Sequence, residues 1–300
     1  MRKKVAWIFV IALLLGILSF SFIPNTTSVA AKRPARHQSH KRHKPVKHKK
    51  NPRLKPTATT TLIPQPSAKH VLTILSVGDS LGEDLGYGLQ DIIGSDPYIH
   101  LVLDAVGSTG LANVAYYNWP VILQEELAKY HPQIMVIVIG GNDAVGFDQN
   151  GSPVEFGTAL WRRDYALRVA GMMSEAEKIK CQVFWVGLPV MSATSVLPNT
   201  SMELLNSVYA AEAKVHPGVI YIPTWNLFMS RSKSFTQYLK NPSGDLLTVR
   251  DSDGVHIAPP AGQELIASDV LLEINKTDHL HICTSSTNYW PEFNVSGCPS

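Results

Sequence analysis

The segment Val71–Leu89, VLTILSVGDSLGEDLGYGL, contains the pattern that decides the fold. Its apolar part, VLTILSV, is continuous rather than alternating, which is typical of a strand buried on both faces of a parallel sheet. The strand pattern ends at Gly78, where a glycine permits a tight turn. We therefore expect Ser80 to lie at or near the amino end of a helix.

Four further apolar runs repeat this strand pattern, at residues 99–106, 134–140, 181–189 and 218–223. Between them lie sequences with helical three- and four-residue spacing, at residues 119–130, 158–180 and 261–274. Strands that alternate with helices form a parallel sheet covered on both faces. The sequence therefore predicts an α/β fold, a three-layer α/β/α sandwich around a parallel sheet of about five strands. Functional groups should lie at the carboxyl ends of these strands.

Two interpretations of the glycine-rich turn are open. A phosphate-binding loop needs G-x-G-x-x-G spacing or a lysine after its glycines, and residues 78–88 have neither. A nucleophile turn needs a serine near a helix start, where backbone N–H groups stabilise developing negative charge. Ser80 fits that position. Gly82, Gly86 and Gly88 suggest room for a bulky substrate.

A serine nucleophile needs a base. Among the histidines, His256 stands out because its surroundings, RDSDGVHIAPP, are rich in loop residues and acids. Asp253 precedes it by three residues, close enough to orient the imidazole, and Asp251 is the alternative. Asn142 and the loop Gly107–Gly110 follow two other predicted strands and can supply hydrogen-bond donors to an oxyanion. Such residues also occur in ordinary turns, but together they supply every group that acyl transfer requires.

These motifs resemble those of the SGNH, or GDSL-type, hydrolases. The blocks are GDS (78–80), STG (108–110), GGND (140–143) and DGVH (253–256), in the order typical of that superfamily. The resemblance extends over roughly Val71–Ile274 and is closest to a bacterial cell-envelope branch. The second block departs from the family pattern, because it lacks the usual Gly-Asp pair.

The resemblance implies a role for each matching residue. Ser80 would be the nucleophile, His256 the base and Asp253 the residue that orients the base. The oxyanion donors would be the backbone N–H groups of Ser80 and Gly110 and the side chain of Asn142. Because of the altered second block, Gly107 is a possible substitute for Gly110.

The implied function is an exported serine esterase that hydrolyses O-acyl esters through an acyl-enzyme. The expected substrate is an acylated glycan or a small ester, with O-acetyl groups of envelope glycans or peptidoglycan as the main expectation. Alternatives are an O-acyltransferase with the same site, a lipid esterase, or a non-catalytic glycan- or wall-binding protein. The chemistry requires no metal or organic cofactor.

The beginning of the chain predicts export. Basic residues precede an uncharged apolar run of nineteen residues, Val5–Ile23, and small residues follow at positions 28–31. Residues 1–31 are therefore a signal peptide or an uncleaved membrane anchor, since about twenty apolar residues span a bilayer. Both alternatives place the rest of the chain outside the cytoplasm, either membrane-anchored or secreted to the periplasm or beyond.

Charge divides the chain sharply. Residues 1–55 contain fourteen Lys and Arg and no acid, which leaves thirteen bases and all 24 acids, a net charge of −11, for the remainder. Residues 32–68 are basic and rich in Pro and Thr, so they predict a disordered linker. This arm is expected to contact a membrane or an anionic envelope polymer. Nucleic acid is not an expected partner of an exported chain.

The catalytic domain is expected over residues 69–276, followed by a C-terminal tail, 277–300. In an oxidising compartment Cys283 and Cys298 would form a disulfide within this tail. Cys181 lies in an apolar run and is expected to be a buried free thiol. The alternative for the tail is a metal site formed by His279, His281 and Cys283.

Overall fold

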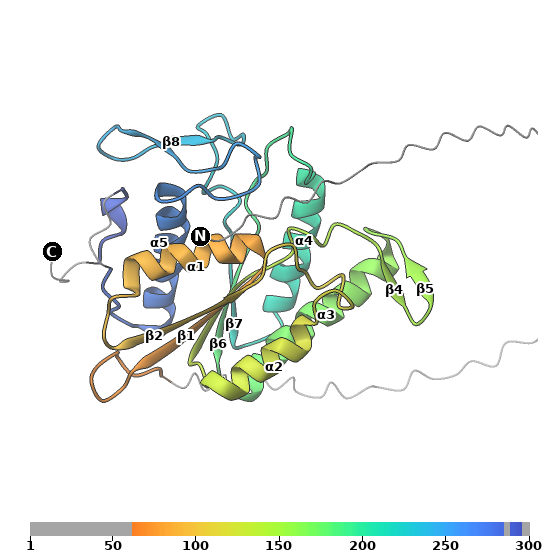
Figure 1. Cartoon of the computed structure of the whole chain (residues 1–300), viewed down its shortest axis with the longest axis horizontal. Coiled ribbons are helices and arrows are strands. Elements are labelled where there is room, and N and C mark those ends of the chain that lie inside the picture. Colours follow the sequence, from red (N-terminus) through yellow and green to blue (C-terminus); the bar gives the residue numbers. More distant parts are fainter. Residues whose placement is uncertain (1–61, 285–288, 296–300) are drawn as a thin grey trace, which may run out of the picture. The chain divides into compact units, whose positions relative to one another are not determined.

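The computed structural model describes residues 62–284 and 289–295. At its centre is a five-stranded parallel sheet in the order β2-β1-β3-β6-β7 (Figure 1). The strands are β1 (Leu72–Gly78), β2 (Ile99–Ala105), β3 (Ile134–Val138), β6 (Gln182–Val186) and β7 (Val219–Ile222). Each begins within one residue of the predicted apolar run, so the predicted sheet is confirmed.

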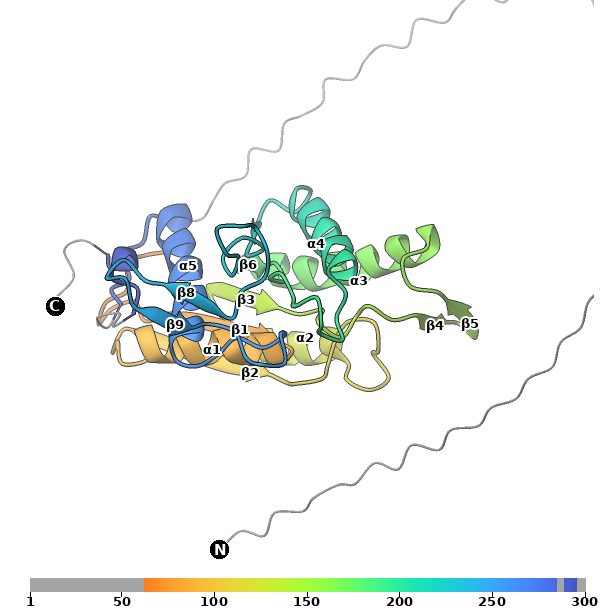
Figure 2. The same ribbon diagram turned by 90° about the horizontal axis from the view of Figure 1, so that it is seen from above.

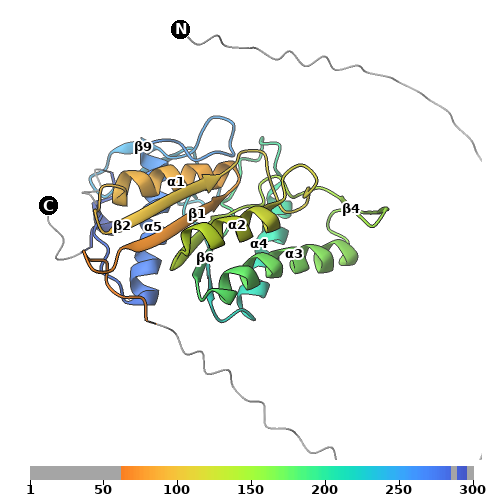
Figure 3. The ribbon, with the colours of Figure 1, turned by 60° about the horizontal axis from the view of Figure 1, so that its bottom comes forward.

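Helices cover both faces of the sheet (Figure 3). Helices α1 and α5 pack against each other on one face, whereas α2, α3 and α4 form the opposite layer. Their bounds are α1 (Ser80–Ile93), α2 (Trp119–Tyr130), α3 (Ala159–Lys178), α4 (Asn199–Ala213) and α5 (Ala261–Asp278). The three-layer α/β/α sandwich is therefore confirmed, and α4 is the main helix that the sequence analysis did not predict.

Three small elements complete the described structure (Figure 2). They are the hairpin of β4 (Phe147–Gln149) with β5 (Ser152–Val154), the hairpin of β8 (Tyr238–Lys240) with β9 (Leu246–Thr248), and a 3₁₀ turn, η1 (Pro291–Phe293). Both hairpins are additions to the loops between the main elements. They were not predicted from the sequence.

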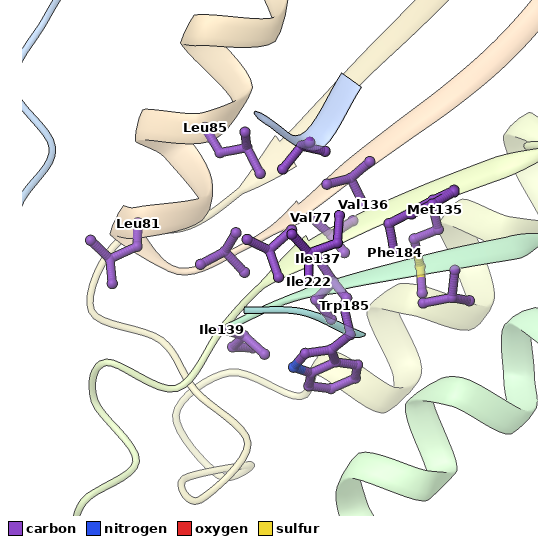
Figure 4. Close-up of a cluster of buried hydrophobic side chains, with 14 of the residues drawn as sticks. Val77, Leu81, Leu85, Met135, Val136, Ile137, Ile139, Phe184, Trp185 and Ile222 are labelled. Carbon is purple, nitrogen blue, oxygen red and sulfur yellow. The ribbon is translucent and has the colours of Figure 1, made fainter. Parts of the chain in front are cut away.

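The core lies between the sheet and its helices (Figure 4). Every residue of β3 is buried, which explains why its apolar run does not alternate. Leu81 and Leu85 of α1 are fully buried on one side of the sheet. Trp185, at the end of β6, is also fully buried. The carboxyl ends of the strands are therefore held in a rigid frame.

Close packing explains most of the glycines in and before α1. A Cβ at Gly78, where φ is +152°, would lie 1.8 Å from the carbonyl oxygen of Val138 in β3. A Cβ at Gly88 would lie 2.2 Å from the carbonyl oxygen of Gln263 in α5, and one at Gly82 would lie 3.0 Å from that of Val138. The expectation that these glycines make room for substrate is therefore wrong for Gly88, which allows backbone contact with α5, whereas Gly82 also lines a hollow beside α1.

The described part of the tail returns to α5. The indole N–H of Trp290 donates to the carbonyl of Ala261 at 2.7 Å. Gln65, within the predicted linker, donates to the carbonyl of His279 at 2.6 Å and accepts the N–H of His281 at 2.9 Å. The folded unit therefore includes at least part of what we predicted as linker.

Several predictions concern parts of the chain outside the described residues. Cys181 is a buried free thiol, as predicted, whereas Cys298 is not described and its disulfide with Cys283 stays a prediction. The predicted span Val5–Ile23 and residues 32–61 also lie outside the described residues. Within residues 62–284 and 289–295, no helix is long and apolar enough to cross a bilayer. The same residues contain no cluster of three potential metal-binding side chains.

Candidate active site

Ser80 is the first residue of α1 and directly follows the turn after β1. Asp79 caps this helix: its carboxylate accepts the N–H of Leu81 at 3.0 Å. The other carboxylate oxygen accepts the N–H groups of Gly140 and Gly141, at 2.9 and 2.8 Å. Burial raises the pKa of Asp79 to about 7, although these N–H donors oppose the shift. Asp79 thus fixes the serine turn to the loop after β3.

The imidazole of His256 lies between Ser80 and Asp253. Its Nε2 is 2.9 Å from Ser80 Oγ, and its Nδ1 is 2.5 Å from Asp253 Oδ2. Asp253 Oδ1 also accepts the backbone N–H groups of Val255 and His256, at 2.8 and 3.0 Å. Asp251 contacts His256 through its backbone N–H, which donates to the His256 carbonyl at 2.9 Å. The structure therefore places Asp253 in the orienting position.

Local charges favour the ion pair that acyl transfer would form. Burial lowers the pKa of His256, but the hydrogen bond and charge of Asp253 outweigh it, and the pKa is raised. The charges of Asp84 and Asp251 add to this effect. Burial raises the pKa of Asp253, but the hydrogen bonds from His256 and the backbone outweigh it, and that pKa is lowered. An ionised Asp253 can therefore support an imidazolium.

A buried arginine braces the loop that carries His256. Arg250 is 0% exposed. Its guanidinium donates to the carbonyls of Val190 and Val255, both at 2.7 Å, and to that of His256 at 3.3 Å. It also lies over two phenylalanine rings, each with its centroid 5.1 Å from the guanidinium carbon. Burial lowers the pKa of Arg250 to about 10, so the group remains a cation at neutral pH.

Asp84 connects the nucleophile's helix with the base's loop. One oxygen of its carboxylate accepts the N–H of Ile257 at 2.9 Å, next to His256. The other accepts the side-chain N–H of Gln263, in α5, at 3.1 Å. Helix α1 therefore carries Ser80 at its amino end and anchors the His256 loop one turn later.

Asn142 lies at the pocket that contains Ser80 and His256. One N–H of its side-chain amide donates to the carbonyl of Thr109 at 2.8 Å, which orients the group and leaves its second N–H for a ligand. The backbone N–H of Ser80 belongs to the first turn of α1, where it has no partner within the helix. Two of the three predicted donors, those of Ser80 and Asn142, are thus at the site.

The loop after β2 supports an oxyanion donor less directly. Gly107 and Ser108 line the pocket, but the Gly107 N–H donates to Oε1 of Glu83 at 3.2 Å. Gly110 packs against a buried carboxylate, since a Cβ there would lie 2.1 Å from Oδ1 of Asp143. Gly110 is not among the lining residues. Its role as an oxyanion donor stays a prediction, and Gly107 is already engaged by Glu83.

Asp143 joins the loop after β2, which carries Gly110, to the loop after β3, which carries Asn142. Its buried carboxylate accepts the N–H groups of Leu111 and Ala112, at 2.8 and 2.7 Å, and the hydroxyl of Tyr165 at 2.6 Å. Arg168 donates to the carbonyls of Leu111 and Ala112, at 2.6 and 2.8 Å. Burial raises the pKa of Asp143, while its donors oppose this. The loops are thus preorganised, as oxyanion stabilisation requires.

The pocket has a volume of about 330 Å³. A loop before α4 forms one wall, and within it Val196 is 88% exposed. None of the lining residues is Lys or Arg. The full lining comprises Ser80, Leu81, Gly107, Ser108, Gly141, Asn142, Thr194, Ser195, Val196, Leu197, Asp253, Val255 and His256. The site therefore suits a small, uncharged group.

Sequence reasoning missed the supporting residues. Asp79 and Asp143 stand beside predicted site residues, and their position next to glycine-rich strand ends is a signal that could have identified them. Arg250 and Asp84 gave no such signal, because their partners are distant in the sequence or are backbone carbonyls. The wall formed by residues 194–197 was also missed, because it lies just before the unpredicted helix α4.

Solved structures of low sequence identity are similar to this chain. A candidate acylhydrolase from Bacteroides fragilis NCTC 9343 is 18% identical, covers 72% of this chain and 92% of its own, and superposes with a TM-score of 0.50. A GDSL-like lipase from Bacteroides thetaiotaomicron VPI-5482 is 16% identical, with coverages of 71% and 92% and a TM-score of 0.48. The first likeness confirms the fold that the four sequence blocks implied.

A catalytic mutant of an acetylxylan esterase from Geobacillus stearothermophilus is 14% identical, with coverages of 68% and 94% and a TM-score of 0.47. No curated protein matches the sequence. A family model matches residues 73–273, from the first strand to the last helix. Because this match covers most of the chain, the protein belongs to the family described as "Protein of unknown function (DUF459)".

Proposed function

We propose that this protein is a serine esterase that transfers the acyl group of an O-acyl ester to water through an acyl-enzyme. The observation that carries the proposal is the continuous hydrogen-bond chain from Ser80 through His256 to Asp253. A serine at a helix start has no reactivity of its own, and a base oriented by a carboxylate is what activates it.

The reaction follows from this geometry in two steps. His256 takes the proton of Ser80 as Oγ bonds to the ester carbonyl carbon, and the negative charge develops on the carbonyl oxygen. The Ser80 backbone N–H and the Asn142 amide stabilise that charge. The bond to the alcohol then breaks, and the alcohol leaves with the proton from His256. Water, activated by the same imidazole, releases the acid and restores Ser80.

The pocket supports a small acyl group, because about 330 Å³ lies at the lower end of the range for ligand sites. The basic arm and the apolar beginning of the chain support an exported protein near the cell envelope. Together they favour O-acetyl groups of an envelope glycan or peptidoglycan. If a sugar hydroxyl replaced water in the second step, the same site would act as an O-acyltransferase.

The proposal is tested by measuring hydrolysis of p-nitrophenyl acetate by the full chain. We expect Ser80→Ala and His256→Ala each to lower kcat by about 10³-fold or more, since each removes a member of one catalytic unit. A fluorophosphonate probe should label Ser80 in the unmodified chain. Equal rates in all three proteins, or a label on another residue, would contradict the assignment. Release of free acid rather than transfer to added oligosaccharide separates hydrolase from transferase.

A further inference from the structure

A second hollow lies beside the Ser80 pocket, between α1 and the edge strand β2, which lie side by side (Figure 3). Its volume is about 110 Å³. It is lined by Ser76 of β1, by residues of α1 and by residues near the end of β2. The full lining comprises Ser76, Gly82, Glu83, Gly86, Tyr87, Leu103 and Ala105. We call this the α1–β2 groove. None of its lining residues takes part in the proposed reaction.

Gly86 opens the floor of the groove. A Cβ at this position would lie 3.2 Å from a methyl group of Leu103 and 3.7 Å from the hydroxyl of Ser76. These are side-chain neighbours, whereas Gly82 and Gly88 meet backbone atoms. The missing side chain of Gly86 is therefore not required by close backbone packing, and its effect is to leave space above Ser76.

The hydroxyl of Ser76 faces this space without a protein partner. Ser76 is 1% exposed, and among the described residues its Oγ has no hydrogen-bond partner. A buried hydroxyl without a partner is energetically unfavourable, so a group that enters the groove and bonds to Ser76 would be stabilised. Such a group must be polar and small, because the hydroxyl lies at the bottom of a narrow hollow.

The rim of the groove combines an aromatic ring with a carboxylate. Tyr87 is 56% exposed and lines the groove, so its ring offers an apolar face beside a polar tip. Glu83 provides acceptor oxygens, and none of the lining residues is Lys or Arg. An aromatic face with a hydroxyl and a carboxylate matches a sugar ring, which has an apolar C–H face and hydroxyl groups at its edge.

Glu83 links the groove to a residue of the Ser80 pocket. It lines the groove, and its carboxylate accepts the N–H of Gly107, which lines the Ser80 pocket. Tyr87 is seven residues beyond Ser80 in α1, about 10 Å along the helix axis. A polymer with its acylated unit at Ser80 would therefore place a unit further along its chain at Tyr87.

We infer that the α1–β2 groove is a subsite for a neutral sugar unit further along the chain than the acylated one, so that the substrate is a polysaccharide rather than a lone small ester. The inference rests on the proposed esterase function for the position of the reacting unit. Binding of the sugar itself does not require catalysis, and the two can therefore fail separately.

Binding is measured by isothermal titration of the full chain carrying Ser80→Ala with an O-acetylated tetramer of N-acetylglucosamine. We expect the addition of Tyr87→Ala to weaken binding about three- to tenfold, the range typical of one aromatic contact. Gly86→Ala, which narrows the groove and favours the helix, should also weaken it. Tyr98→Ala removes another exposed tyrosine, outside the groove, and should leave the Kd unchanged.

Activity provides the second readout, in the chain with Ser80 intact. In Tyr87→Ala and Gly86→Ala, the ratio of kcat/KM for the tetramer to kcat/KM for p-nitrophenyl acetate should fall about three- to tenfold. An unchanged Kd and an unchanged ratio in both variants would overturn the subsite and leave the groove as a water site. Tyr87-dependent binding without any esterase activity would retain the subsite and refute the proposed function.

Discussion

The protonation state of His256 sets the pH range in which Ser80 can react. The imidazole must be neutral to accept the serine proton, and its pKa is raised mainly because Asp253 outweighs the effect of burial. We therefore expect kcat/KM for p-nitrophenyl acetate to rise with pH, with a midpoint above the ordinary histidine value of about 6.5.

Asp253→Asn should move that midpoint to lower pH, because it removes the charge and the hydrogen bond that raise the pKa of His256. The same change should lower kcat by about 10⁴-fold, as loss of the orienting carboxylate does in other Ser-His-Asp sites. The pH profile of kcat/KM and kcat at the plateau measure the two effects.

Asp251→Asn is the matched control, because Asp251 contributes charge but bonds to His256 through its backbone. We expect a smaller shift of the midpoint in the same direction, with kcat at the plateau close to that of the unmodified protein. Equal loss of kcat in both variants would show that Asp253 is not the orienting residue.

At the scale of the elements, the position of α1 depends on its glycines. A Cβ at Gly88 would lie 2.2 Å from a backbone oxygen of α5. Gly88→Ala should therefore lower the melting temperature and force α1 away from α5, although alanine favours a helix by up to about 1 kcal/mol. Since Asp84 of α1 holds the His256 loop, kcat should fall as well.

The control lies in α3, where a Cβ at Gly171 would meet nothing within 4 Å. Gly171→Ala should gain the helix preference without a clash and stabilise the protein by about 0.5–1 kcal/mol. Urea unfolding of both variants compares them directly. A stabilised Gly88→Ala variant would contradict the close contact between α1 and α5.

The main elements could be predicted because their patterns are local. Both faces of β3 are buried, so its sequence is a continuous apolar run, and α3 has a regular apolar spacing that ends near Lys180. Helix α4 also buries residues at helical spacing, among them Met202, Leu205 and Tyr209, and this signal was overlooked. The two hairpins have strands of only three residues, which are too short to show a period.

The main residues of the candidate site could also be predicted from the sequence. Ser80, Asn142 and His256 follow strands or lie in an acid-rich loop, and the parallel topology brings such positions together at one edge. Arg250 was not predictable as a bracing residue, because its partners are backbone carbonyls. Backbone carbonyls carry no sequence signature. The packing of Gly110 was not predictable either, because the carboxylate that it packs against, Asp143, comes from a different loop.

At the scale of the whole molecule, charge separates the chain into a basic arm and an acidic remainder. We predict that the chain without residues 1–31 binds vesicles rich in phosphatidylglycerol and that a variant which also lacks residues 32–61 binds them much less. Binding should be lost at about 1 M salt, where charges are screened beyond about 3 Å. Co-sedimentation measures the bound fraction.

A variant in which the Lys and Arg residues of 32–61 are replaced by Gln keeps the length of the arm and serves as its control. It should behave like the deletion. If it binds as well as the unmodified chain, then the charge of this segment is not what holds the protein to the surface.

Arg250 restricts which loops can be exchanged between members of this family. Its one guanidinium holds the carbonyl of Val190, which leads into the pocket wall, and those of Val255 and His256, which carry the base. The wall and the base are therefore not independent modules. A loop transplanted into positions 190–197 to change substrate choice must present a carbonyl where Val190 does. A graft that fails to do so would disturb the base even if the new wall were well shaped.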